Sequence, residues 1–173
     1  MFNFLKKKRR PAPAPTDTLG CIIRTATAAN IPVLVALRKQ LLMEEGAPPW
    51  ARNPLPDLDA PLGDYFARAI TDGSFVAWVA ETDGEIIATG GLCFYALPPT
   101  FSEPAGQAAY ITNMYTRNEY RRRGIATALL HMAIGEAKAR GYAAVRLHAS
   151  KDGKPIYQKA GFVDSYGYMA MRL

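Results

Sequence analysis

The most constraining feature of this 173-residue sequence is a direct switch from a strand pattern to a helical pattern around residues 121–126. Residues 109–116 are rich in β-branched and aromatic side chains, which favours a strand. After the loop, apolar residues recur at helical spacing from Ile125 to Ala133, and Gly141 is a stop signal. A strand joined so closely to a helix is typical of mixed α/β domains.

The rest of the chain extends this pattern. Thr82-Asp83-Gly84 separates two β-rich runs and predicts a hairpin. We expect a disordered basic arm and Pro/Ala linker at 1–17 and one α/β domain at 18–173, in which helices flank a mixed sheet. The expected strands cover residues 21–24, 75–81, 85–95, 109–116, 143–149 and 161–171, and the expected helices cover residues 31–45, 62–71, 125–140 and 153–160.

The loop itself has the properties of an anion site. The first N–H groups of a helix have no partner within the helix, and the helix dipole makes that end positive. Gly124 and Ala126 lack bulk, and Arg121, Arg122 and Arg123 add donors suited to phosphate. These residues alone predict either a cradle for a diphosphate or a solvated basic face beside a plain turn.

A second motif decides between these interpretations. Residues 121–126 match strand–[Q/R]xxGx[G/A]–helix, and the next predicted helix carries Tyr-x-x-x-Gly-Phe at residues 157–162. Together with the order of elements from Cys21 to Leu173, this resembles the GNAT superfamily of acyl-CoA-dependent N-acetyltransferases. The resemblance implies a mostly antiparallel central sheet, acetyl-CoA as co-substrate, and no metal.

The resemblance also implies which residues bind coenzyme A. The backbone amides of residues 122–127 would hold the diphosphate, and the main chain of residues 114–116 would pair with the pantetheine arm. One N–H near Met114 would polarise the thioester carbonyl. Ser150 stands where the family often has Asn. The predicted cofactor-binding residues are Met114, Tyr115, Thr116, Arg121, Arg122, Arg123, Gly124, Ile125, Ala126, Thr127 and Ser150.

Two residues are predicted to be catalytic. Tyr157 occupies the position from which a family hydroxyl protonates the departing sulfur, although a tyrosine there also suits an amphipathic core position. His148 is the predicted base for the amine, and it is expected on the strand face opposite Val145 and Leu147. Each candidate base also has a plain role as a surface charge or a core histidine, and the other candidates are Glu44, Glu45 and Glu103.

The net charge of +6 conceals three blocks of alternating sign. Residues 1–10 hold five basic and no acidic side chains, residues 11–110 are net acidic, and residues 111–173 are net basic. If the acidic residues 11–110 form the acceptor site beside a basic cofactor-binding half, they favour a cationic amine as acceptor. Acidic side chains spread over a solvated surface would give the same net charge. Four aromatic residues of the acidic half are expected either to line the acceptor site or to pack: Trp50, Phe66, Tyr95 and Phe101.

The sequence therefore predicts direct transfer of an acetyl group from acetyl-CoA to a small primary amine. The alternatives are acetylation of a protein N-terminus or lysine, and a non-catalytic CoA-binding or membrane-adaptor protein. We expect no nucleic-acid partner; a weak membrane contact through residues 1–10 and a homodimer are further hypotheses. No apolar stretch reaches the length of a membrane span and no secretory signal follows the basic arm, so the predicted location is cytoplasmic.

Overall fold

A computed structural model of the chain describes residues 16–18, 20–47, 54–101 and 103–165. Six strands form one sheet in chain order, from β1 at one edge to β6 at the other. All neighbours are antiparallel except β5 and β6, which are parallel. The strands are β1 (Thr16–Thr18), β2 (Cys21–Thr25), β3 (Phe75–Thr82), β4 (Glu85–Ala96), β5 (Gln107–Thr116) and β6 (Val145–Leu147).

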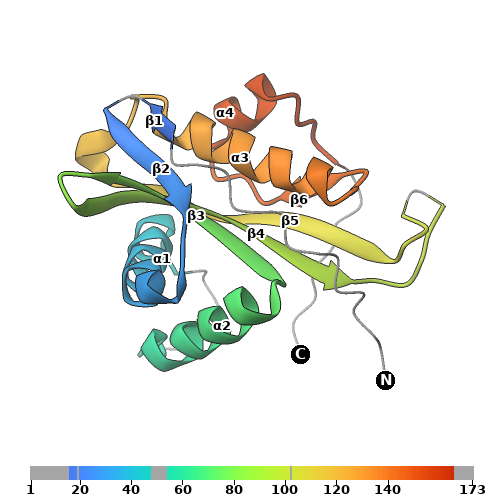
Figure 1. Cartoon of the computed structure of the whole chain (residues 1–173), viewed down its shortest axis with the longest axis horizontal. Helices are drawn as coiled ribbons and strands as arrows, with labels where there is room; N and C mark the ends of the chain where they lie inside the picture. Colours follow the sequence, from blue (N-terminus) through green and yellow to red (C-terminus); the bar gives the residue numbers. More distant parts are fainter. Residues whose placement is uncertain (1–15, 19, 48–53, 102, 166–173) are drawn as a thin grey trace.

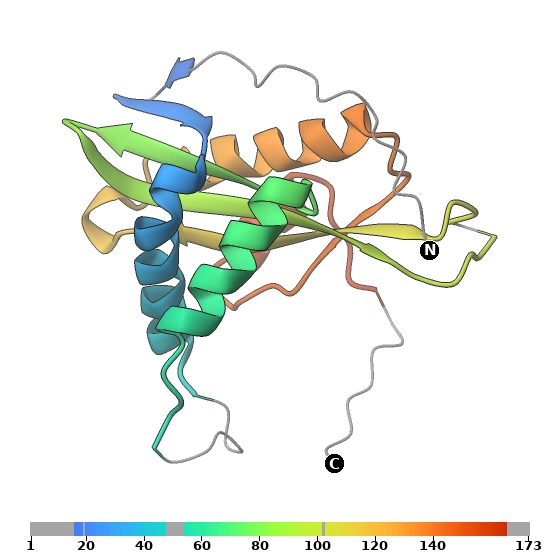
Figure 2. The same cartoon turned by 60° about the horizontal axis from the view of Figure 1, so that its bottom comes forward.

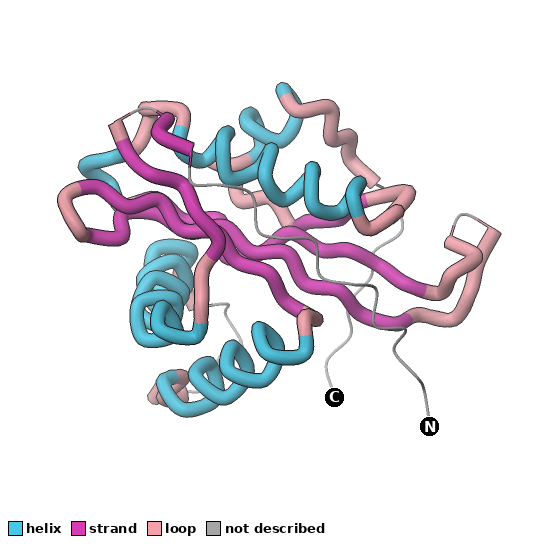
Figure 3. Tube along the Cα trace, in the orientation of Figure 1, coloured by secondary structure: helices cyan, strands magenta, loops and turns pink. Residues whose placement is uncertain are grey.

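Helices cover both faces of the sheet (Figure 1, Figure 3). One face carries α1 (Ile31–Glu45) and α2 (Asp59–Asp72), which lie side by side across it in Figure 2. The opposite face carries α3 (Ile125–Ala139) and α4 (Lys154–Lys159). Two single-turn 3-10 helices, η1 (Ala28–Asn30) and η2 (Asn118–Tyr120), precede α1 and α3.

The sheet divides the core into two clusters. Under α3, Leu129, Leu130 and Ala133 are fully buried and pack against the sheet beside Trp78. Under α1 and α2, an aromatic group joins Phe66 and Phe75, whose ring centroids are 5.3 Å apart, to Tyr65. Two buried layers on one sheet are what a domain of this length needs to bury most of its apolar surface.

The expected α/β class, with a mixed and mostly antiparallel sheet flanked by helices, is confirmed. Several predicted bounds were wrong. The predicted strand 143–149 is only Val145–Leu147, and α2 begins three residues earlier than expected because Asp59 opens its first turn. β1 lies across the predicted boundary between residues 17 and 18.

The predicted final strand was also wrong in its first part. Residues 161–165 form a turn and irregular chain after α4, where the Tyr157 carbonyl accepts the Phe162 N–H at 3.0 Å. The remainder of that predicted strand and most of the predicted arm, at residues 1–15, lie outside the described residues.

The close packing at Gly91 gives a stability prediction. A Cβ atom built there would lie 2.5 Å from Cζ of Phe75, whose ring is held in the aromatic group under α2. Gly91→Ala should therefore lower the free energy of unfolding by about 1–3 kcal/mol, measured by urea denaturation. Gly135→Ala, in the middle of α3 with open space around it, should instead raise stability by up to about 1 kcal/mol. Equal effects of the two substitutions would contradict the packing argument.

Candidate functional site

The pairing of β5 breaks at its centre. On the β4 side, Thr112 pairs with Gly91 and Tyr115 pairs with Thr89, so Asn113 and Met114 together face the single residue Gly90. This is a β-bulge, and Asn113 adopts the left-handed conformation with φ of 55°. Asparagine tolerates that conformation better than most residues do.

On its other side, β5 separates from β6. The two strands pair only between residues 109–111 and Val145–Leu147. Among the described residues, no strand pairs with residues 112–116 along that edge. The backbone groups of this half of β5 are therefore available to an extended ligand between the strands.

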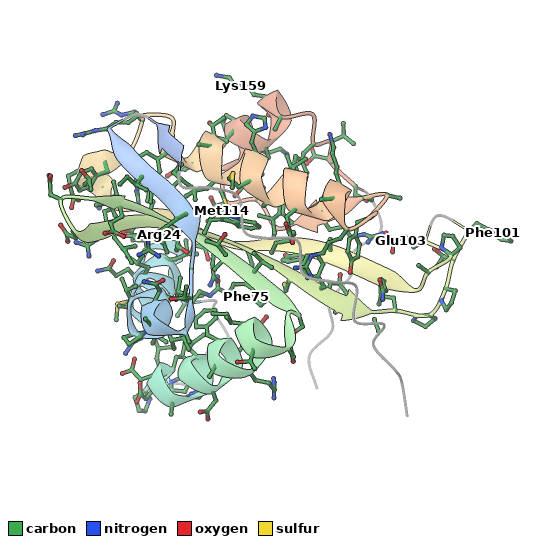
Figure 4. All side chains as sticks on the ribbon, in the orientation of Figure 1. Arg24, Phe75, Phe101, Glu103, Met114 and Lys159 are labelled. Carbon is green, nitrogen blue, oxygen red and sulfur yellow. The ribbon has the colours of Figure 1, made fainter. Side chains whose placement is uncertain are left out.

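Gly90 makes room for the bulge. A Cβ atom at Gly90 would lie 2.9 Å from Sδ of Met114 and 3.2 Å from Cβ of Leu129. The missing side chain lets Met114 pack across β4 toward α3, near the centre of the sheet in Figure 4. Glycine inside a strand often marks such a close approach.

The loop between β5 and α3 presents a row of backbone donors. Arg122 and Gly124 have φ of 61° and 84°, and Arg123 between them is not in the positive-φ region. Alternation of left- and right-handed residues is the backbone pattern that directs successive N–H groups toward one anion. In the described structure none of the six N–H groups of residues 122–127 has an acceptor, whereas the next, that of Ala128, donates to the Gly124 carbonyl at 3.0 Å. These N–H groups lie at the positive end of the α3 dipole, and their binding of a diphosphate stays a prediction.

The three arginines of the loop have different surroundings. Arg121 Nε donates to the Thr116 carbonyl at 2.8 Å, and its Nη2 lies 2.5 Å from Oε2 of Glu44 in α1. Arg123 donates to the Glu119 carbonyl and lies over the ring of Tyr120. Arg122 is exposed, with no side-chain partner among the described residues.

Glu44 joins α1 to this loop. Its carboxylate accepts the Tyr115 hydroxyl at 2.7 Å as well as Arg121. The Tyr115 hydrogen bond first, and then Arg121, hold the pKa of Glu44 below its usual value. The side chain that was a candidate base is therefore a poor proton acceptor, and it fixes the loop in place. A cavity of about 340 Å³ opens beside it, lined in part by Gln40, Met43 and Asn118.

Tyr157 lies on α4 and belongs to the core cluster on the α3 face of the sheet. Its side chain is 9% exposed and packs edge-on against Phe162, and burial raises its pKa, with smaller contributions from Glu45 and Tyr110. The hydroxyl therefore keeps its proton across the neutral range. Ser150 lies just before this helix, where its Oγ accepts the Gly153 N–H at 3.1 Å.

The other candidate bases lie in different places. His148 follows the last residue of β6 and is exposed, so the predicted alternation along a strand does not extend to it. Glu103 lies in the β4–β5 loop and pairs with Arg146 at 2.7 Å, away from Met114 in Figure 4. Glu45 is exposed at the end of α1.

A cavity of about 240 Å³ lies on the α1/α2 face beside the bulge. It is lined by residues of α1, α2, β4 and β5, among them Arg38, Phe66, Cys93, Thr112 and Asn113. Of the four aromatic residues expected near an acceptor, Phe66 lines this cavity, and Phe101 projects fully exposed from the far end of the β4–β5 hairpin (Figure 4). Tyr95 is 36% exposed near that end, and Trp50 lies outside the described residues.

A family model confirms the resemblance on which these roles depend. Residues 39–162 match the model of the Acetyltransferase (GNAT) family. The chain belongs to this family. The matched range holds the bulge, the amide cradle and Tyr157 of this GNAT domain together.

Individual relatives agree with this assignment. Human N-acetyltransferase 8B is 30% identical over 120 residues, which are 66% of this chain and 50% of that protein, so the chain spans about half the length of this curated relative. Among solved structures, a predicted acetyltransferase with acetyl-CoA from Clostridium acetobutylicum is 38% identical, with a TM-score of 0.80 over 87% of this chain and 94% of that one. A GCN5-related N-acetyltransferase from Ralstonia eutropha is 29% identical, with a TM-score of 0.79 over 89% and 99% of the two chains.

Some residues of this GNAT site were not found from the sequence. Asn113 and the pair Gly90-Gly91 build the bulge, and two adjacent glycines inside a β-rich run are a signal that predicts one. Arg38 gave no signal, because only the packing of α1 turns it toward the cavity. Among the described residues, no group of three or more acidic, His or Cys side chains is arranged to hold a metal, and no helix is long and apolar enough to span a membrane.

The Glu44 contacts predict a pH-dependent loss of stability in Glu44→Gln. Because the pKa of Glu44 is lower in the folded than in the unfolded chain, its contribution is present above the unfolded value of about 4.3 and is lost as pH falls through the folded value. The side chain is 37% exposed, so we expect a deficit of about 1 kcal/mol or less at pH 7.

The deficit should shrink in thermal melts below about pH 4, as the wild-type carboxylate also becomes protonated. Glu45→Gln is the matched control, since Glu45 has no ion pair within the described chain, and it should melt like the wild type. A deficit that stays constant from pH 7 to pH 3 would show that the charge of Glu44 is not what stabilises the loop.

Proposed function

We propose that this protein transfers an acetyl group from acetyl-CoA to the primary amine of a small molecule. The observation that carries this proposal is the row of six unpartnered N–H groups at residues 122–127. Such a row, at the start of a helix and beside exposed Arg122, suits a diphosphate. The similar Clostridium acetobutylicum protein was solved with acetyl-CoA, which supports the choice of ligand.

The open half of β5 suits the rest of that ligand. The pantetheine arm carries amide groups, and the unpaired edge at residues 112–116 offers main-chain partners for them. In this proposal the Met114 N–H, at the bulge, donates to the thioester carbonyl oxygen as negative charge develops on it. Arg121 and Glu44 hold the loop, and Ser150 is a further candidate contact to the arm.

The proposed reaction needs no covalent enzyme intermediate. The neutral amine nitrogen forms a C–N bond with the acetyl carbon as the C–S bond breaks; the nitrogen loses a proton and the sulfur gains one. Tyr157, which keeps its proton at neutral pH, is the proposed donor to sulfur. His148, exposed at the end of β6, stays the predicted base for the amine.

The cradle is tested by removing the conformational freedom of Gly124. Any other L-residue at φ of 84° is strained by about 1–2 kcal/mol, so Gly124→Ala should distort the loop and raise the Kd of acetyl-CoA at least tenfold in calorimetric titration. Gly141→Ala is the matched control: φ is 82° at the other end of the same helix, with open space around it. Both variants should melt earlier, but only Gly124→Ala should lose affinity. Equal Kd values would contradict the cradle.

The proton donor is tested by Tyr157→Phe. Removing a general acid costs about 10²–10⁴-fold in rate, and a thiolate of pKa about 8.5 needs less help than most leaving groups, so we expect kcat to fall about 10–100-fold. The Kd of acetyl-CoA should change little, because the ring still packs against Phe162. Tyr142→Phe, a second tyrosine whose pKa is raised by burial and which stacks on Phe94, should keep its kcat. An unchanged kcat in Tyr157→Phe would remove the hydroxyl from the mechanism.

A further inference from the structure

We infer that the acceptor amine also carries a carboxylate, which Arg38 and Asn113 bind in the cavity between α1, α2 and the sheet. This inference rests on the proposed function, because it identifies the second substrate of the same reaction. It also departs from the charge of the surrounding sequence. Residues 11–110 are net acidic, but the described residues that line the cavity include no carboxylate, and Arg38 is their one charged side chain.

Asn113 supplies the clearest sign of a missing partner. Its side chain is 5% exposed and lines the cavity, and its Nδ2 has no hydrogen-bond partner. Its Oδ1 is 3.4 Å from the Thr112 hydroxyl, so the amide's acceptor is used and its donor is not. A buried donor without a partner is unfavourable, and a ligand oxygen that reaches it from the cavity would supply the missing acceptor.

Arg38 supplies the charge. It is half-buried on α1, and its charge acts on the Cys93 thiol across the cavity, partly offsetting the rise in pKa that burial causes there. Within the described residues Arg38 has no carboxylate partner, unlike Arg24, Arg121 and Arg140. A guanidinium that faces an apolar cavity with no counter-ion is suited to a planar anion, which it can bind through two hydrogen bonds.

The remaining walls define the size and polarity of the acceptor. Leu62, Phe66 and Tyr65 contribute apolar surface from α2. Partial burial raises the pKa of the half-buried Tyr65 to about 12, so its hydroxyl stays neutral. A volume of about 240 Å³ is below the usual range for drug-sized ligands, about 300–1,000 Å³. The cavity therefore fits a small amine with one carboxylate and one apolar group, as in an apolar amino acid.

The cavity also lies beside residues of the proposed chemistry. Asn113 directly precedes Met114, the proposed donor to the thioester oxygen, and Tyr110 lines the cavity while lying close enough to Tyr157 to affect its pKa. A carboxylate held at Arg38 and Asn113 would leave the amine of a small amino acid near the bulge. Binding of the acceptor carboxylate and transfer of the acetyl group would thus use the adjacent residues Asn113 and Met114 of β5.

The experiment compares amines that share an apolar group but differ in charge. Thiol release from acetyl-CoA is followed with leucine, leucinamide, 3-methylbutylamine and putrescine. The same comparison of amino acid, amide and simple amine is then made for the side chains of alanine and phenylalanine. One charged hydrogen-bonded contact is worth about 1.5–3 kcal/mol. We therefore expect kcat/KM for at least one carboxylated amine to exceed that of its amide and its simple amine by about 10–100-fold.

Two substitutions assign the preference to the cavity. Arg38→Gln should lower kcat/KM for the carboxylated amine at least tenfold and leave its amide nearly unchanged. Asn113→Asp keeps the side-chain shape and the tolerance for positive φ, but it replaces the N–H donor by a carboxylate that repels the carboxylate of the substrate. It should therefore also lower kcat/KM for the carboxylated amine. Arg68→Gln, an exposed arginine of α2 outside the cavity lining, is the matched control and should keep the wild-type preference.

The outcomes separate the two proposals. If acetyl-CoA raises the melting temperature but putrescine, the amides or the simple amines react as well as the carboxylated amines, the acceptor inference is overturned and the proposed function stands. A carboxylate preference that survives in Arg38→Gln and Asn113→Asp, each checked for a cooperative melt, also overturns it. If acetyl-CoA neither shifts the melting temperature nor releases thiol with any amine, the proposed function itself fails.

Discussion

A strand can bind a ligand through its backbone only where its own ladder of hydrogen bonds stops, because paired N–H and C=O groups have nothing left to offer. In this protein the ladder stops along half of β5, where β6 has separated on one side and the bulge interrupts β4 on the other. The two helical layers pack on opposite faces of the sheet and leave this edge between them. The chain runs from the open half of β5 through η2 to the loop before α3, so the proposed main-chain contacts to acetyl-CoA lie where the pairing ends.

The sequence predicts this site as far as local signals reach. Residues 121–126 alone are equally compatible with a diphosphate cradle and with a plain turn beside a basic face, and the Tyr-x-x-x-Gly-Phe motif at residues 157–162 decides between them and identifies Tyr157. The bulge depends on contacts between distant segments: Asn113 adopts positive φ, and the next residue, Met114, packs where β4 lacks a side chain at Gly90. The shortness of β6 and the irregular chain after α4 likewise result from tertiary packing, which β-propensity does not encode.

The net charge of residues 11–110 likewise does not predict the charge inside the cavity that these residues help to form. The acidic excess of residues 11–110 comes largely from side chains that pair with nearby cations or lie at the surface, as Glu81 does with Arg24 and Asp59 with Lys39. The cavity among these same elements contains Arg38 instead. A bound ligand is affected mainly by the few charges close to it, because salt in the solvent screens exposed charges more than about 10 Å away.

α1 has a consequence for how the two substrates influence each other. Arg38 and Glu44 lie on the same helix about 9 Å apart along its axis, and Glu44 is bonded to the loop that carries the amide cradle. In the proposed assignment the middle of α1 lines the acceptor cavity through Arg38, and its last turn contacts the proposed cofactor loop through Glu44, so one helix joins the two proposed sites. Because thermodynamic linkage is reciprocal, any factor by which one substrate raises the affinity for the other must apply equally in both directions.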